Sequence, residues 1–306
     1  MATLKAIRKR ISSTKSTQKI TRAMKMVAGA RLARAQSRIL ALRPYTLKTQ
    51  EILAALAAPG ADEAGDDVVE KEPDHPYLAH RPEQNVALLI LTGDRGLCGA
   101  FNTNINKAAE RTWREHTAQG RTVQLFTVGR KGRDYLKRRQ APLADDFPLS
   151  GELNLDKARL ISRTMAPRLV KGEIDSIYLV YNEFKSAMTQ RVVVERLLPL
   201  RRAENGEAVA SAASAGAGAQ TEFIFEPNKR ALLDRLVPMY VEISILRALL
   251  ESSASELGAR MTAMDSATKN AKEMIDSLTL AYNRARQAAI TKELMEIIGG
   301  AEALKE

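Results

Sequence analysis

The stretch from residue 239 to residue 289, MYVEISILRALLESSASELGARMTAMDSATKNAKEMIDSLTLAYNRARQAA, decides the fold. It contains no proline, and apolar or small residues recur in it every three or four positions. That spacing places them along one side of a helix, the pattern of a coiled-coil seam. Pro238 can open this helix at its first turn, and at about 1.5 Å per residue the helix would be on the order of 90–100 Å long. The predicted seam consists of Met239, Ile243, Leu246, Leu250, Ala254, Leu257, Met261, Met264, Thr268, Ala271, Ile275, Leu278, Tyr282, Ala285 and Ala289.

The partner of this seam is predicted at the opposite end of the chain. Residues 2–57 are rich in helix formers and carry an apolar stripe at a similar spacing. Thr14, Gln18 and Thr21 interrupt the stripe, and Pro44 either kinks the helix or sits in a local break. We therefore expect an antiparallel coiled coil of the two terminal helices. The predicted stripe consists of Leu4, Ile7, Ile11, Ile20, Met24, Val27, Leu32, Ala35, Ile39 and Leu42.

The middle of the chain predicts a small, doubly wound, Rossmann-like α/β domain inserted between the two helices. VALLILT, residues 86–92, is a continuous apolar run, as expected of a strand buried on both faces. Strand and helix patterns then follow in the order β-α-β-α-α-β-β, with an antiparallel edge formed by the last two strands. The predicted division is an N-terminal coiled-coil helix at 1–58, an acidic proline-rich loop at 59–85, the α/β domain at 86–200, a flexible loop at 201–226 and the C-terminal coiled-coil helix at 227–306.

The charge of the chain is distributed unevenly. The net charge is +11, and residues 1–50 carry 13 Lys and Arg but no Asp or Glu. Such a helix needs a negative partner, which could be nucleic acid, anionic lipid or an acidic protein surface. No run of 18 or more apolar residues predicts a membrane span, and no apolar region near the N-terminus predicts a secretory signal.

Catalytic, cofactor and metal motifs are absent from the sequence. The turn GDRGLCG, residues 93–99, sits where a Rossmann phosphate loop would, but its glycines are spaced G-x-x-G-x-x-G and no Lys-Ser/Thr follows. Cys98 cannot form a disulfide within the chain because it is the only cysteine. His75, His80 and His116 are scattered and give neither a catalytic base beside Cys98 nor a ligand spacing. We expect a tight turn, no catalytic site, no cofactor and no metal.

Four segments of the chain closely resemble ATP synthase gamma subunits, the central stalk of the F-type ATPase. They lie in the family's order and span nearly the whole chain. The segments are TQKITRAMKMVA at 17–28, TGDRGLCGAFN at 92–102, ARMTAMDSATKNA at 259–271 and YNRARQAAITKEL at 282–294.

The resemblance implies a rotating shaft without a catalytic site of its own. Its coil would stand inside a ring of three alpha and three beta subunits, which carry out the ATP chemistry. Its α/β domain and foot would bind the epsilon subunit and the c-ring of the membrane sector, where ions are translocated. The protein would be peripheral on the cytoplasmic face of a bacterial plasma membrane, without nucleic acid and without inserting into the membrane.

The resemblance also implies roles for individual residues. Family beta subunits present an acidic lever to the shaft, and Met24 matches a position that faces it, close to the matches of Arg260, Gln287 and Thr291. Arg286 is a further candidate for coupling to beta. The alternative for Met24, Gln287 and Thr291 is that they are ordinary residues of the seam or its flanks. Phe223 and Phe225 match a segment near the c-ring and are candidates either for ring contact or for core packing of a short strand.

Two rival functions make different predictions. A basic coiled-coil protein that binds nucleic acid would be basic along the whole rod, whereas residues 226–306 carry 12 acids and 11 Lys and Arg. A Rossmann-type enzyme with helical arms would bind nucleotide at the turn of residues 93–99, where the glycine spacing is wrong.

Overall fold

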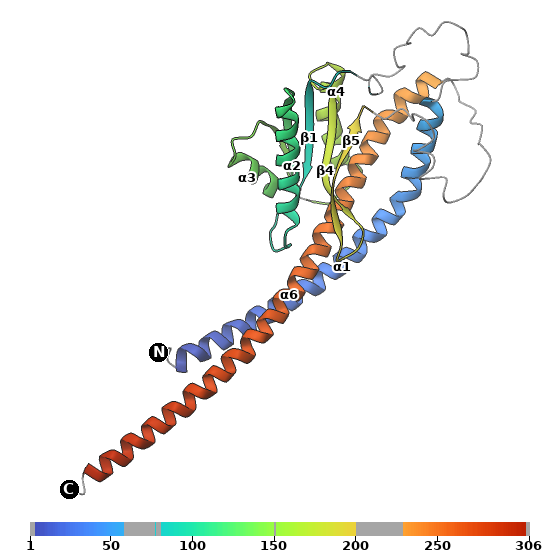
Figure 1. Cartoon of the computed structure of the whole chain (residues 1–306). Helices are drawn as coiled ribbons and strands as arrows, with labels where there is room; N and C mark the ends of the chain where they lie inside the picture. The colour runs from blue at the N-terminus through green and yellow to red at the C-terminus, as the bar shows by residue number, and fades with distance from the viewer. Residues whose placement is uncertain (1–3, 58–76, 78–80, 150, 200–228, 304–306) are drawn as a thin grey trace. The chain divides into compact units, whose positions relative to one another are not determined.

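The computed structural model describes residues 4–57, 77, 81–149, 151–199 and 229–303. These residues form two compact units, one made of the described residues up to Ala30 and from Arg260 onward, the other lying within 31–259. Two long helices, α1 (Leu4–Ala57) and α6 (Lys229–Ala303), contribute to both units (Figure 1). The predicted fold class, two terminal helices with an α/β domain between them in sequence, is confirmed. The predicted division into five segments stays a prediction, and its loop at 201–226 lies outside the described residues.

The first unit is an antiparallel pair of helices. Thr21 on α1 lies opposite Thr268 on α6, with their hydroxyl oxygens 2.8 Å apart. One turn further along α1, the ammonium of Lys25 donates to the carboxylate of Asp265 at 2.6 Å. Because α1 runs forward while its partners on α6 run backward, these contacts fix the antiparallel register of the coil.

The seam of α6 is confirmed, whereas the predicted stripe of α1 is wrong in two places. Every predicted seam residue of α6 is buried or half-buried. On α1, Thr21 is buried and Thr14 and Gln18 are half-buried, so these polar residues continue the seam. Ile20 and Val27 are instead 57% and 53% exposed. The helical period thus outweighs hydrophobicity, because each of the two apolar residues stands one position outside the three–four spacing.

The second unit contains a five-stranded sheet in the order β3-β2-β1-β4-β5. The first four strands are parallel, and β5 is antiparallel to β4, which confirms the expected antiparallel edge. The predicted element order is wrong at one point, because it lacked β3. The bounds are β1 (Asn85–Leu91), α2 (Phe101–Ala118), β2 (Thr122–Val128), α3 (Arg130–Lys137), β3 (Leu143–Phe147), α4 (Leu155–Val170), β4 (Ser176–Phe184) and β5 (Gln190–Leu198).

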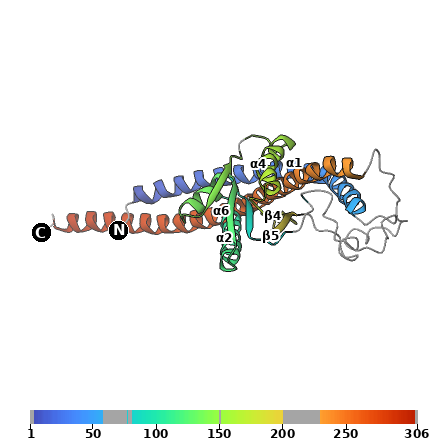
Figure 2. The same ribbon diagram turned by 90° about the horizontal axis from the view of Figure 1, so that it is seen from above.

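Helices cover both faces of this sheet. Along β1, Leu88 and Ile90 belong to the core with α2 and α3, while Leu89 and Leu91 belong to the core with α4 and α6. Figure 2 shows α2 and α4 on opposite sides of the strands. The fourth covering helix is a part of α6, whose buried residues on this face are Val241, Ile245, Ala248 and Leu249.

Two prolines lie inside the long helices. Pro238 is in the interior of α6 and does not begin it, so the predicted helix start at this residue is wrong. Pro44 is likewise inside α1, which continues through it to Ala57. A helix that is packed along its length tolerates the hydrogen bond lost at one proline, since most helical stability in proteins comes from tertiary packing.

Candidate functional site

The glycine-rich turn follows β1 at the carboxyl ends of the parallel strands, which is where doubly wound folds bind nucleotides. The main-chain amides at the start of α3 point into this turn, and all three find acceptors there. The amide of Arg130 donates to the carboxylate of Asp94 at 2.9 Å, and that of Gly132 to the hydroxyl of Thr92 at 2.8 Å. The amide of Lys131 donates to the carbonyl of Gly93 at 3.1 Å. These bonds satisfy the amides at the start of α3 and tie that helix to the turn.

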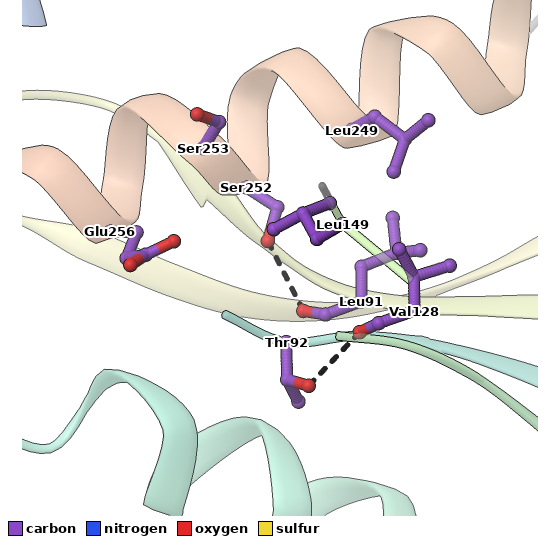
Figure 3. Close-up of a pocket in the computed structure, with 8 residues that line it drawn as sticks. All are labelled: Leu91, Thr92, Val128, Leu149, Leu249, Ser252, Ser253 and Glu256. Atoms are coloured by element: carbon purple, nitrogen blue, oxygen red, sulfur yellow. Dashed lines mark hydrogen bonds between the residues drawn. The ribbon is translucent and has the colours of Figure 1, made fainter. Parts of the chain in front are cut away.

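Helix α6 packs against the same carboxyl ends of the strands. The carboxylate of Glu256 lies 2.8 Å from the point that a Cβ on Gly93 would occupy. The hydroxyl of Ser252 donates to the carbonyl of Leu91 at 3.2 Å, and that of Thr92 to the carbonyl of Val128 at 3.0 Å (Figure 3). What is left is a small cavity lined by Leu91, Thr92, Val128, Leu149, Leu249, Ser252, Ser253 and Glu256. A phosphate bound beside Gly93 would meet the carboxylate of Glu256 and the packed helix α6. This arrangement disfavours nucleotide binding and therefore the Rossmann-type enzyme.

Cys98 and His116 lie at opposite ends of α2. The thiol of Cys98 is buried before the helix begins and receives a hydrogen bond from the side-chain amide of Asn102 at 3.2 Å. His116 is in the last turn of the helix, 15 residues and about 22 Å beyond its first residue at 1.5 Å per residue. The two side chains cannot act as a nucleophile and its base. Among the residues that the structure describes, no group of three or more His, Cys, Asp or Glu could hold a metal ion.

A polar cluster stands at the amino ends of the strands. The carboxylate of Glu83 accepts from Arg121 at 2.7 Å, from Arg196 at 2.6 Å and from the hydroxyl of Tyr178 at 2.9 Å. Arg121 also contacts the Nδ1 atom of His116 at 3.0 Å. Burial, followed by the charge of Arg121, lowers the pKa of His116 below its usual value. These contacts tie α2, β4 and β5 together.

The positive charge of α1 is largely unmatched. Of the 13 bases that precede Glu51, only Lys25, Arg38 and Lys48 form an ion pair within the described parts of the chain. The remaining ten therefore have no acidic partner among the described residues. Unmatched charge at this density favours an acidic surface on another molecule.

Apolar side chains are exposed on the first unit as well. Neither these helices nor any other described helix is both long and apolar enough to cross a membrane. Exposed apolar side chains in a unit that also carries unmatched charge indicate an interface with another protein. They are Ile20, Met26, Val27, Met274, Leu280, Ile290, Leu294, Met295, Ile297 and Ile298, each more than half exposed.

The candidate coupling residues fall in two places. Met24 and Arg260 are half-buried, while the second group is exposed. The expectation that Met24 lies close to Gln287 is wrong, because the neighbouring Lys25 pairs with Asp265, 22 residues and about 33 Å from Gln287 along α6. The exposed second group comprises Arg286, Gln287 and Thr291.

Phe223 and Phe225 lie outside the described residues, so neither alternative for them is tested. On α1, the predicted stripe included Ile20 and Val27 but not Met26, and all three are exposed. Placing Thr21 in the seam, as the helical period requires, would have identified them.

Comparison with known proteins identifies the family. Residues 3–304 match the family described as ATP synthase. Over the full length of both chains, the protein is 60% identical to the ATP synthase gamma chain of Sorangium cellulosum (strain So ce56). It is 48% identical, again over both full lengths, to that of Anaeromyxobacter sp. (strain Fw109-5). The chain belongs to the ATP synthase gamma-chain family. The resemblance inferred from the four segments is thereby confirmed, and the nucleic-acid alternative finds no support.

Solved structures agree with this membership. The chain is similar to one in the central stalk and c-ring of Tetrahymena thermophila mitochondrial ATP synthase, with a TM-score of 0.55 and 26% identity over 81% of this chain and 99% of that one. It is also similar to one in the rotor of Euglena gracilis mitochondrial ATP synthase, with a TM-score of 0.65 and 21% identity. That match covers 94% of this chain and 98% of the other, and it supports the fold.

Proposed function

We propose that this chain is the rotating central shaft of an F-type ATP synthase. It couples proton translocation through the membrane sector to ATP synthesis or hydrolysis on alpha and beta subunits, and it has no catalytic site of its own. The observation that carries the proposal is the surface of the first unit, where unmatched bases stand beside exposed apolar side chains.

A surrounding sleeve fits this surface for two reasons. The seam of the coil is small and polar, with Thr21 against Thr268 and Ala271 nearby, so each turn buries little apolar area. The outer side chains Met26 and Ile297, 63% and 72% exposed, add apolar area that only a partner can bury. A ring of three alpha and three beta subunits around one copy of this chain supplies such a sleeve, and an acidic lever on beta supplies the counter-charge.

The coupling contacts are proposed at two levels of the coil. Met24 and Arg260 would meet beta at one level, and Arg286, Gln287 and Thr291 at the other. The exposure of the second group supports this, since a residue that touches a partner must be accessible in the free chain. Changing all five should lower the number of protons pumped per ATP hydrolysed, and fully coupled pumping would contradict the assignment.

The remaining contacts place the protein at the membrane. We propose that the α/β domain and the foot of the coil bind the epsilon subunit and the c-ring, with Phe223 and Phe225 as candidate ring contacts. The protein is then peripheral on the cytoplasmic face of the bacterial plasma membrane. The bacterial sources of the most similar relatives support this location.

Reconstitution tests the proposal. The full-length chain is mixed with the alpha and beta subunits of its own synthase, and assembly mass and ATPase activity are measured. We expect a complex of three alpha, three beta and one copy of this chain, with ATPase activity that depends on the chain. A chain that stays alone and binds RNA or DNA tightly at physiological salt would favour the nucleic-acid alternative.

Charge reversal tests the interface itself. Replacing Arg8, Lys15 and Arg22 by Glu should weaken assembly about tenfold, because three surface pairs at roughly 0.5 kcal/mol each sum to about 1.5 kcal/mol. The effect should shrink as salt is raised.

The matched control reverses three bases of the second unit. Lys131, Lys137 and Arg138 are exposed and form no ion pair among the described residues. Their replacement by Glu changes the net charge equally and should leave assembly with alpha and beta intact. Equal weakening by both triple variants would show that net charge, and not the α1 surface, drives the association.

A further inference from the structure

Helix α6 has two kinds of contact with the sheet, and they constrain it differently. Its apolar contacts, including Val241, Ile245 and Leu249, hold it against the face that α4 also covers. Close packing of these side chains fixes the distance between helix and sheet and the face of the helix that is buried. Hydrogen bonds are lost over a short displacement, so they limit the smaller rotations that packing allows.

Two buried serines supply directional contacts to neighbouring strands. The hydroxyl of Ser252 donates to the carbonyl of Leu91, the last residue of β1, at 3.2 Å. The hydroxyl of Ser255 donates to the carbonyl of Asn182 in β4 at 3.0 Å. Both serines are at most 5% exposed, and water therefore does not replace these bonds easily.

Arg247 connects α6 to a third strand, β5. One Nη atom of Arg247 donates to both carboxylate oxygens of Glu195 on β5, at 2.7 and 2.8 Å. The same carboxylate accepts from the hydroxyl of Tyr181 on β4 at 2.8 Å, which orients it. Arg247 also lies 3.7 Å from Glu251, one turn along α6. The side chain of Arg247 is mostly buried, at 26% exposed, so solvent screens these charges only partly.

We propose that Arg247, Ser252 and Ser255 form a torsional lock, which fixes the rotation of α6 relative to the sheet and so carries torque between the α/β domain and the shaft. The inference rests on the proposed function and assigns positioning residues to it. Turning a helix by about 20° moves an atom at its outer radius of roughly 5 Å by about 1.7 Å, sideways to a bond that points away from the helix axis. A hydrogen bond of 3.0 Å then lengthens to about 3.5 Å, the limit beyond which donor and acceptor no longer bond. The lock therefore resists slip within a small angle.

The test removes the two serine bonds with minimal change of volume. In the complex with alpha and beta subunits, a bead is attached to the α/β domain through a cysteine introduced at exposed Lys137, while Cys98 stays buried. Ser252→Ala/Ser255→Ala should at least double the angular variance of the bead during catalytic pauses. Its unloaded ATPase rate should stay within twofold of the parent, because hydrolysis without load demands little torque.

The matched control is Ser253→Ala, a neighbouring serine that lines the same cavity and makes no hydrogen bond of its side chain among the described residues. In vesicles that contain the whole synthase, the serine double variant should pump at least threefold fewer protons per ATP hydrolysed than this control. Equal angular variance and equal pumping in the two would overturn the lock.

A second variant covers the case in which the double serine variant does not assemble. Arg247→Met removes the charge pair and keeps the aliphatic stem, and its control, Arg114→Met, breaks the pair with Glu110 on α2, away from α6. The lock predicts larger angular variance for Arg247→Met alone, and equal variance in the two would overturn it. If the unmodified chain does not assemble with alpha and beta, the proposed function fails, and the lock fails with it. Normal assembly with unchanged variance refutes the lock alone.

Discussion

Gly129 joins β2 to α3, and replacing it by alanine should unfold the α/β domain more easily than any surface change. Its backbone has φ = 91° and ψ = 145°, a conformation that residues with a side chain rarely adopt. A Cβ at this position would lie 2.3 Å from the carbonyl oxygen of Thr92 and 2.9 Å from its carbonyl carbon. Both are main-chain atoms, so no side-chain rotation relieves the contact.

The magnitude follows from two contributions. The backbone strain costs about 1–3 kcal/mol. Relieving the clash must displace Thr92, whose amide donates to the carbonyl of Val128 and whose hydroxyl accepts from Gly132. Losing one of these buried bonds costs about 1–2 kcal/mol more. We therefore expect Gly129→Ala to lower the free energy of unfolding by roughly 2–5 kcal/mol.

Urea unfolding of the full-length chain, followed by fluorescence of its single tryptophan, Trp113 on α2, measures this loss. Two glycines separate the contributions. Gly120 has φ = 77° but no atom within 4 Å of a Cβ, so Gly120→Ala should cost about 1–2 kcal/mol from strain alone. Gly96 has neither feature, and Gly96→Ala should change stability by less than about 0.5 kcal/mol. A loss for Gly129→Ala no larger than that for Gly120→Ala would refute the steric part of the reasoning.

Two further predictions concern polar contacts in the two units. Burial and Arg121 lower the pKa of His116, so the folded chain binds a proton there less readily than the unfolded chain. The associated stability is complete above the unfolded pKa of about 6.5 and is lost as the pH falls through the folded value. His116→Gln should therefore flatten the pH dependence of the free energy of unfolding between pH 7.5 and 5, and an unchanged slope would contradict the assignment. In the coil, a double-mutant cycle of Thr21→Val and Thr268→Val should give a coupling of about 0.5–1.5 kcal/mol, measured by thermal unfolding, for their 2.8 Å contact. A coupling of zero would show that the two hydroxyls are satisfied by their own helices.

The elements that could be predicted from the sequence are those whose buried residues follow a regular pattern, either a continuous apolar run or a three–four spacing. Residues 86–91 of β1 are all apolar because α2 and α4 cover opposite faces of the sheet. The strand β3 has no such run, since it lies at the sheet edge and is half-exposed at alternate residues. Its Asp146 is exposed and pairs with Arg133 of α3 at 3.2 Å. That contact exists only after the strand has paired, and local propensity disfavours aspartate in strands.

The candidate coupling residues could be proposed from the resemblance, whereas their positions relative to one another could not. The coupling candidates came from matched motifs, and the antiparallel register then separated Met24 from Gln287. The residues that hold α6 to the sheet gave no signal in the sequence. Ser252 and Ser255 look like ordinary helix residues, because their acceptors, Leu91 and Asn182, lie 161 and 73 residues away. A hydrogen bond to a distant main-chain carbonyl leaves no pattern of spacing.

The distribution of apolar residues along α6 explains how one helix serves both units. Between Val237 and Leu250 it is buried on two sides: Ile243 and Leu250 stand on the seam, while Val241 and Leu249 belong to the core of the sheet. From Arg260 onward the seam residues remain buried or half-buried, while other apolar residues such as Met274 are exposed. A helix segment that is apolar on two sides packs against two partners, and a segment that is apolar on one side packs against one. The change from two buried sides to one therefore marks where the α/β domain ends along the shaft, and it coincides with the boundary between the two compact units at Ala259.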